Sequence, residues 1–217
     1  CGRHDVSAHD KAQGPSQFVT EAYQVEDEAS VVEFYGKWAT DYDNQMNGLG
    51  YASPTMIAED LHTHLGDPEA TVFDLGCGTG LTCTYLAERG YQSLDGIDLS
   101  PDMVRVASER GIYRELLVGD ITKPLARDSG QYDGVICSGT FTHGHVGPEP
   151  LDEVHRILRA GGILACTVHQ DLWELLGFDK ALAAMVSSGR FKQLSLRRDI
   201  YYRGGEPEGW FCVYQKT

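Results

Sequence analysis

Three glycines at alternate positions, directly after an apolar run, are the most constraining feature of this chain. The segment reads Val-Phe-Asp-Leu-Gly-Cys-Gly-Thr-Gly-Leu over residues 72–81. Glycine has no Cβ atom, so the backbone here can turn sharply and lie directly against a ligand. A helix is expected just beyond, and its free N–H groups would face whatever sits on the glycines. The pattern predicts a loop that binds a cofactor.

Strand-like and helix-like segments alternate beyond residue 70. The predicted strands cover residues 71–75, 93–99, 116–118, 132–138 and 163–169, and the predicted helices cover 81–89, a segment opening at Pro101, 149–159 and 172–187. Gly161-Gly162 are expected to separate the third of these helices from the next strand. Two aromatic strands, around 191–202 and 210–214, close the chain across a glycine-rich link.

Alternation of this kind predicts an α/β fold in which crossover helices connect parallel strands. We expect a doubly wound, Rossmann-like, seven-stranded sheet that is mostly parallel. Its C-terminal hairpin is expected to add an antiparallel strand at the edge. Residues 1–29 are polar with little apolar periodicity, so they are expected to form a mobile tail, and residues 30–217 a single domain.

Charge and cysteine usage restrict the classes of partner. The chain of 217 residues carries a formal net charge of −14 and has a pI of about 4.8, which disfavours nucleic acid unless a local basic patch overrides the total. Its six cysteines form no Cys-x-x-Cys pair and fit small buried residues in a reducing cytoplasm. No apolar run reaches the length of a membrane span, so no membrane partner is expected.

The spacing of the glycines discriminates between cofactors. The dinucleotide fingerprint places glycine at its first, third and sixth positions. Gly76 and Gly78 fit the first two, but Leu81 occupies the sixth. This departure disfavours NAD and FAD, and a phosphate-binding P-loop is excluded because no Gly-Lys-Ser/Thr follows.

Two further acids follow the next predicted strands. Asp98 ends the second strand, where a carboxylate could accept hydrogen bonds from both ribose hydroxyls. Asp98 could instead cap the following helix, although Ser100 is better placed for that. Asp120 follows the third strand, where it could accept from an adenine amino group. Together with Asp74, these acids lie at the carboxyl ends of neighbouring strands, where ligands bind in open α/β sheets.

On these motifs the chain resembles the class I S-adenosylmethionine-dependent methyltransferases. The matching segments are 74–80, 96–100, 119–121, 132–136 and 158–162. The resemblance covers about residues 30–170, and the segments follow one another in the same order as in the family. More narrowly, residues 34–43 and 90–103 resemble the Williams–Beuren-region methyltransferase-like proteins.

The resemblance implies S-adenosylmethionine as cofactor, S-adenosylhomocysteine as product, and residues 30–66 as a helical lid over the cofactor site. It places Asp74 near the amino group of the cofactor and Asp98 on its ribose. The remaining implied contacts are Gly76, Cys77, Gly78 and Gly80 under the methionine portion, Leu99, Met103, Asp120 and Ile121 around the adenine, Cys137 and Ser138 near the methionine end, and Tyr35 and Tyr42 over the site.

Two histidines follow the fourth predicted strand. His143 is the first candidate for a general base and His145 the second, because neutral imidazole is available near pH 7. Alternatively, they are ordinary loop residues hydrogen-bonded to the backbone. A His-x-His metal site is disfavoured because no third ligand lies nearby, so no metal is predicted.

The sequence therefore predicts transfer of a methyl group to a small-molecule acceptor, on oxygen or nitrogen. Two alternatives remain: a cofactor-binding protein that acts through a partner without catalysis, and an NAD-dependent oxidoreductase. A cytoplasmic monomer or homodimer is expected.

Overall fold

The computed structural model describes residues 28–142 and 146–217. Its helices are α2 (Glu28–Trp38), α3 (Tyr42–Gly48), α4 (Ser53–Leu65), α5 (Leu81–Ala87), α6 (Pro101–Glu109), α7 (Leu151–Ile157), α8 (Leu172–Leu175) and α9 (Phe178–Ser187). Its strands are β1 (Val72–Leu75), β2 (Leu94–Asp98), β3 (Tyr113–Val118), β4 (Tyr132–Phe141), β5 (Leu158–His169), β6 (Phe191–Tyr202) and β7 (Gly205–Lys216). Residues 1–27 of the predicted tail lie outside the described residues, and residues 28 and 29 belong to α2.

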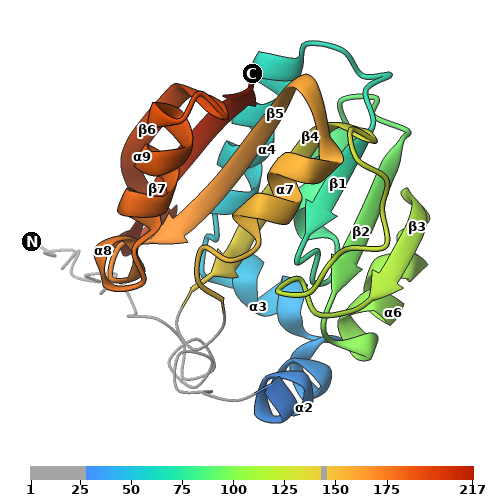
Figure 1. The fold of residues 1–217 in the computed structure, drawn as a ribbon. Helices are drawn as coiled ribbons and strands as arrows, with labels where there is room; N and C mark the ends of the chain where they lie inside the picture. The colour runs from blue at the N-terminus through green and yellow to red at the C-terminus, as the bar shows by residue number, and fades with distance from the viewer. Residues whose placement is uncertain (1–27, 143–145) are drawn as a thin grey trace, which may run out of the picture.

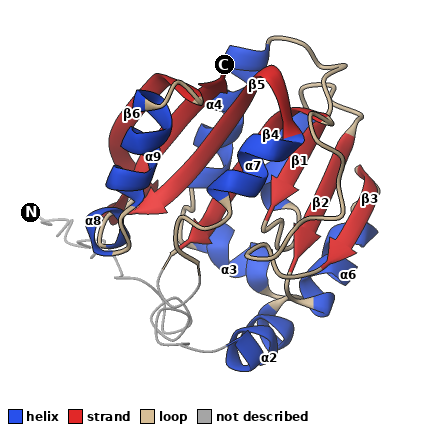
Figure 2. Cartoon of the chain, viewed as in Figure 1, coloured by secondary structure: helices blue, strands red, loops and turns tan. Residues whose placement is uncertain are grey.

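One seven-stranded sheet runs through the molecule in the order β3-β2-β1-β4-β5-β7-β6 (Figures 1 and 2). All neighbouring strands from β3 to β5 are parallel, whereas β7 is antiparallel to both β5 and β6. The predicted fold class is confirmed. The hairpin lies at the edge of the sheet as expected, with β7 as its inner strand, because α8 and α9 carry the chain past the place of β7 to the edge strand β6.

Each central strand places successive side chains on opposite faces of the sheet, as the period of two requires. Phe73 and Leu75 of β1 belong to the core under α7, α8 and α9, whereas Val72 belongs to the core under α4 and α5. Strands β4 and β5 divide their side chains between the two cores in the same way. Helices therefore cover both faces, which explains why the strands read as continuous apolar runs.

Several predicted boundaries differ from the structure, among them the starts of β3 at Tyr113 and of β7 at Gly205, and glycine explains two of the differences. The helix predicted over residues 172–187 is divided into α8 and α9 at Gly177, which has a φ of 78°. Gly161-Gly162 do not interrupt β5 but lie within it, at a shift in its register with β4. A Cβ atom on Gly162 would lie 2.9 Å from the carbonyl oxygen of Arg159, so only glycine fits this close crossing.

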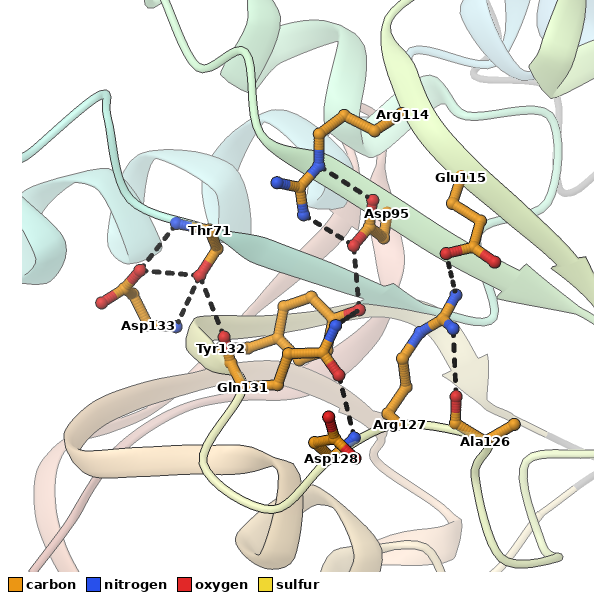
Figure 3. Close-up of polar contacts among 10 residues, drawn as sticks. All are labelled: Thr71, Asp95, Arg114, Glu115, Ala126, Arg127, Asp128, Gln131, Tyr132 and Asp133. Atoms are coloured by element: carbon orange, nitrogen blue, oxygen red, sulfur yellow. Dashed lines mark hydrogen bonds and ion pairs between the residues drawn. The ribbon is translucent and has the colours of Figure 1, made fainter.

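A polar network ties together the amino ends of β2, β3 and β4, away from the edge where the glycine loop lies (Figure 3). The buried Asp95 carboxylate accepts two bonds from the Arg114 guanidinium, at 3.1 and 2.7 Å, and one from the Tyr132 hydroxyl at 2.9 Å. Beside them, Arg127 pairs with Glu115 at 3.1 Å and lies over the Phe73 ring. Bonds to a charged group in a buried setting are the stronger kind, so this network stabilises the sheet.

Replacing Tyr132 by phenylalanine is expected to lower the free energy of unfolding by about 1.5 kcal/mol, because one hydrogen bond to the Asp95 carboxylate is lost while Arg114 still neutralises it. Urea denaturation of the wild type and the variant measures the difference. Tyr85→Phe, on α5 and remote from Asp95, is the matched control. Equal stability of the wild type and Tyr132→Phe would contradict the assigned role.

The connection between α3 and α4 is held by the C-terminal hairpin. Ala52 N donates to Tyr201 O at 2.8 Å, and Arg203 N donates to Gly50 O at 2.9 Å. Between these bonds, Tyr51 and Tyr202 form a β-bridge and their rings lie 5.2 Å apart. Residues near the end of the chain thus position Tyr51 at the carboxyl end of the parallel strands.

Candidate cofactor site

A cleft with a cavity volume of about 150 Å³ lies at the carboxyl ends of β1, β2, β3 and β4. Strand order reverses between β1 and β4, and such a switch point is where open α/β sheets bind ligands. Eleven of the predicted cofactor residues line it: Tyr35, Tyr42, Gly76, Cys77, Gly78, Asp98, Leu99, Met103, Asp120, Ile121 and Ser138. The structure thus brings most of the predicted set to one cleft, and their cofactor contacts stay predictions.

The three glycines of the loop are required for three different reasons. A Cβ on Gly76 would lie 2.2 Å from Thr140 Oγ1, so Gly76 lets β4 approach the loop. Gly78 has a φ of 53° and its missing Cβ points into open space, which leaves bare backbone for a ligand. Gly80 has a φ of 85°, precedes α5 and does not line the cleft.

Asp98 lies within the loop and organises it. Its Oδ2 accepts from Gly78 N at 2.8 Å and its Oδ1 accepts from Ser100 N at 2.9 Å. Burial raises the pKa of this carboxyl above its ordinary value. Each oxygen has about two acceptor sites, so one on each remains for a pair of ribose hydroxyls. The helix cap is Ser100, as predicted: its Oγ accepts from Met103 N at 3.3 Å.

Asp120 follows β3 at the far end of the cleft. Its Oδ1 accepts from the backbone and hydroxyl of Thr122, at 2.8 and 2.7 Å. Partial burial acts to raise the pKa of Asp120, but the Thr122 bonds and the Lys123 charge outweigh it and hold the pKa below its ordinary value. Asp120 therefore stays ionised, and its second oxygen faces Lys123 at 3.6 Å.

Three predicted residues, Asp74, Gly80 and Cys137, are not part of the cleft lining. Asp74 is 1% exposed and lies beneath the loop, where its Oδ2 accepts from the Tyr113 hydroxyl at 2.7 Å. Burial raises the pKa of Asp74 to about 6. Cys137 is fully buried within β4, beside Cys166 of β5. In this structure Asp74 and Cys137 contact the protein interior instead of the cleft.

Aromatic and hydroxyl side chains line the part of the cleft near β4. Tyr35 and Tyr42 come from α2 and α3, and both rings contact Trp38, which is 4% exposed and belongs to the core. Burial raises the pKa of Tyr42 and of Tyr51, so both hydroxyls stay protonated near neutral pH. Ser138 Oγ is buried there without a hydrogen bond of good geometry to any described residue.

Sequence reasoning did not assign nine lining residues to the site: Tyr51, Pro54, Thr79, Leu81, Thr82, Gly119, Gly139, Thr140 and Val146. Several lie inside or beside motifs that were recognised, so extending each motif by a residue or two would have found them. Tyr51 had no such local signal. Its hydroxyl lies 2.5 Å from where a Cβ of Gly139 would stand, a contact that depends on the bridge to Tyr202.

The two candidate bases, His143 and His145, lie outside the described residues, so their role stays a prediction. Val146, directly after them, lines the cleft. Over residues 28–142 and 146–217, no cluster of three or more His, Cys, Asp or Glu side chains could hold a metal ion. Within the same residues, no helix combines the length and apolar character needed to cross a membrane.

Known proteins share this architecture. A methyltransferase domain family matches residues 73–166. Human Methyltransferase-like protein 27 is 32% identical over 152 residues, which cover 69% of this chain and 62% of the relative. A solved complex between the Haloferax volcanii Trm112 methyltransferase activator and a methyltransferase matches with a TM-score of 0.65 at 21% identity, covering 84% of this chain and 97% of that one.

Together, the doubly wound sheet, the glycine loop with Asp98 and the methyltransferase-domain match over residues 73–166 support a class I S-adenosylmethionine-dependent methyltransferase. The recognition and the cofactor prediction are confirmed for this class. Within it, the match to Methyltransferase-like protein 27 agrees with the narrower resemblance.

Shorter matches reach relatives that act on different molecules. An Arabidopsis thaliana 18S rRNA (guanine-N(7))-methyltransferase is 42% identical over 65 residues, or 30% of this chain and 22% of the relative. A Saccharomyces cerevisiae mitochondrial ubiquinone biosynthesis O-methyltransferase is 33% identical over 123 residues, or 54% of this chain and 39% of the relative. The chain spans 62% or less of the length of these curated relatives.

Proposed function

We propose that this protein transfers a methyl group from S-adenosylmethionine to oxygen or nitrogen of a small-molecule acceptor. The observation that carries the proposal is the cleft itself, in which Asp98, Asp120 and the bare backbone of Gly78 meet at the switch point of the sheet. Asp98 would bind the ribose and Asp120 the adenine edge. The exposed backbone at Gly78 would lie under the methionine portion of the cofactor.

When bound, S-adenosylmethionine supplies a methyl group on a positively charged sulfur. Transfer would join that methyl carbon to the acceptor atom, break its bond to sulfur and release S-adenosylhomocysteine. Alignment and exclusion of water supply most of the acceleration in such a reaction. The tyrosine ring faces favour a cation next to them. The protonated Tyr51 hydroxyl would serve as a hydrogen-bond donor in the cleft. The proton of the acceptor would pass to a base, for which His143 stays the first candidate.

The acceptor side of the cleft supports a small, largely uncharged acceptor. Tyr35, Tyr42, Tyr51 and Ser138 surround it, and none of these side chains is charged near neutral pH. Two arginines of β6 that could attract an anionic acceptor are engaged elsewhere: Arg197 pairs with Asp60 and Arg198 with Glu208. The net charge of −14 disfavours an RNA acceptor, although some relatives methylate rRNA.

Calorimetric titration with S-adenosylmethionine, S-adenosylhomocysteine and NAD tests the cofactor. Binding of the first two and none of NAD is expected, and the opposite result would refute the proposal. Formation of S-adenosylhomocysteine is then measured in two arms, one with a protein-free small-molecule extract and one with purified RNA. Turnover with the extract alone supports the proposal. Turnover with RNA alone would mean that the acceptor is RNA and not a small molecule. Cofactor binding without turnover in either arm would favour the non-catalytic alternative. A cytoplasmic location is likewise part of the proposal.

A further inference from the structure

Asp43, at the start of α3, contacts two residues from distant parts of the chain. Thr79 Oγ1, in the glycine loop, donates to Asp43 Oδ1 at 2.6 Å. The Arg110 guanidinium, just after α6, donates through Nη2 to Asp43 Oδ2. We name Asp43, Thr79 and Arg110 the Asp43 latch. It joins the N-terminal helical segment to the loop that the cofactor requires.

Arg110 makes the latch rigid. Its Nε donates to the carbonyl oxygen of Thr79, and its Nη1 donates to Thr84 Oγ1 at 3.1 Å, on α5. A planar guanidinium offers its donors in a fixed fork, so one side chain sets the relative position of α3, the loop and α5. The side chains of Arg110 and Asp43 are 21% and 31% exposed, so solvent screens this pair less than a fully exposed one.

The latch lies beside the cofactor cleft and connects parts of its wall. Thr79 lines the cleft from the loop, and Tyr42, the neighbour of Asp43 in sequence, lines it from α3. A second close contact lies nearby, because a Cβ on Gly36 of α2 would be only 2.8 Å from Asp102 Oδ2 of α6. The helical segment is therefore fastened to the sheet domain on the side where Tyr35 and Tyr42 reach the cleft.

We propose that Arg110, acting through Asp43, is a positioning residue that retains the cofactor. The inference rests on the proposed function and adds a residue to it. With the latch intact, the glycine loop and the tyrosines of α2 and α3 are held in place before the cofactor arrives, so little freedom is lost on binding. Without it, the two parts of the wall separate more readily, and the cofactor binds more weakly and leaves faster.

The test compares Asp43→Asn, Arg110→Gln and the double variant in calorimetric titration with S-adenosylhomocysteine, with its dissociation rate measured by stopped flow. Each single change is expected to raise the Kd about tenfold, mostly through faster dissociation. The double variant is expected to bind no more weakly than the weaker single variant, because both remove the same interaction. Arg105→Ala, on α6 with an exposed pair to Glu109, is the matched control and is expected to bind like the wild type.

Thermal unfolding with and without S-adenosylhomocysteine separates positioning from stability. A latch role reduces the rise in Tm that the ligand causes, whereas a merely structural role lowers both Tm values equally and leaves the Kd unchanged. The second pattern, or strictly additive single effects, would overturn the inference. Thr79→Val, which removes only the Oγ1 bond, serves if a charge variant fails to fold. A wild type that binds no S-adenosylhomocysteine would overturn the proposed function as well.

Discussion

Replacing Asp98 by alanine is expected to weaken S-adenosylmethionine binding by about a hundredfold, because the proposed ribose role would lose two hydrogen bonds from hydroxyls to a charged acceptor. The structure adds a second cause. The same carboxylate holds Gly78 N and Ser100 N, so the variant also loosens the backbone on which the cofactor would rest. Calorimetric titration measures the affinity, and circular dichroism checks that the fold persists.

Asp98→Asn separates the two causes. Asparagine keeps one oxygen for a backbone N–H but has only one acceptor oxygen and no charge. We expect it to keep most of the stability that alanine loses while still binding the cofactor at least tenfold more weakly than the wild type. Asp102→Asn, on the exposed start of α6, controls for the loss of a nearby negative charge. Wild-type affinity in both Asp98 variants would remove the ribose role.

The free energy of unfolding of Asp74→Asn is compared with that of the wild type at the same pH. The variant's advantage is expected to be larger at about pH 8 than at about pH 4. Burial raises the folded-state pKa of Asp74 from 3.8 to about 6, a difference that corresponds to about 3 kcal/mol in the free energy of unfolding. Because the folded-state pKa is the higher one, the contribution of Asp74 is fully present below the unfolded pKa and is lost as pH rises through about 6. Asparagine cannot ionise, so its advantage grows by about 2 kcal/mol between these pH values.

Urea denaturation across this pH range measures the effect, and Asp133→Asn supplies a control of opposite sign. Burial acts to raise the pKa of Asp133, but its bonds with Arg159 and Thr71 outweigh this and lower the pKa. Its contribution is therefore present above the unfolded pKa and is lost as pH falls, so Asp133→Asn is most destabilising near neutral pH. A pH-independent Asp74→Asn difference would contradict the assigned burial. If Asp74→Asn binds the cofactor with unchanged affinity, Asp74 lies under the loop in solution as well and does not contact the cofactor.

Much of the fold could be predicted because it depends on local patterns. Strand β6 begins and ends where the aromatic alternation predicts, and β1 differs from its predicted range by one residue. The interior position of β7 could not be predicted, since sequence neighbours such as β6 and β7 pair in the same way whichever of them lies at the edge. The division between α8 and α9 depends on one glycine with a positive φ, which a helical pattern tolerates.

The residues of the site also separate into those that local sequence patterns predict and those that depend on distant contacts. Asp98, Gly78 and Asp120 were predictable because each follows a strand directly, and strand ends meet at one edge of a parallel sheet. The positions of two other lining residues depend on packing between distant segments. Thr140 packs against Gly76, and Tyr51 is held by the C-terminal hairpin. No local sequence pattern encodes such contacts. Asp74 was placed on the cofactor by resemblance, whereas the Tyr113 hydroxyl holds its carboxylate inside.

The interior position of β7 has a consequence for how the sheet is joined to the cleft. Among the strands that the structure describes, β6 has β7 as its one neighbour in the sheet, and its last residue, Tyr202, also bridges to Tyr51. The hairpin is attached to the parallel half of the sheet, from β3 to β5, through the antiparallel pairing of β7 with β5. It also holds the Tyr51 segment, and Tyr51 lines the cleft. The same hairpin therefore closes the sheet on this side and fixes one wall of the cleft, so a change that displaces β6 would disturb both.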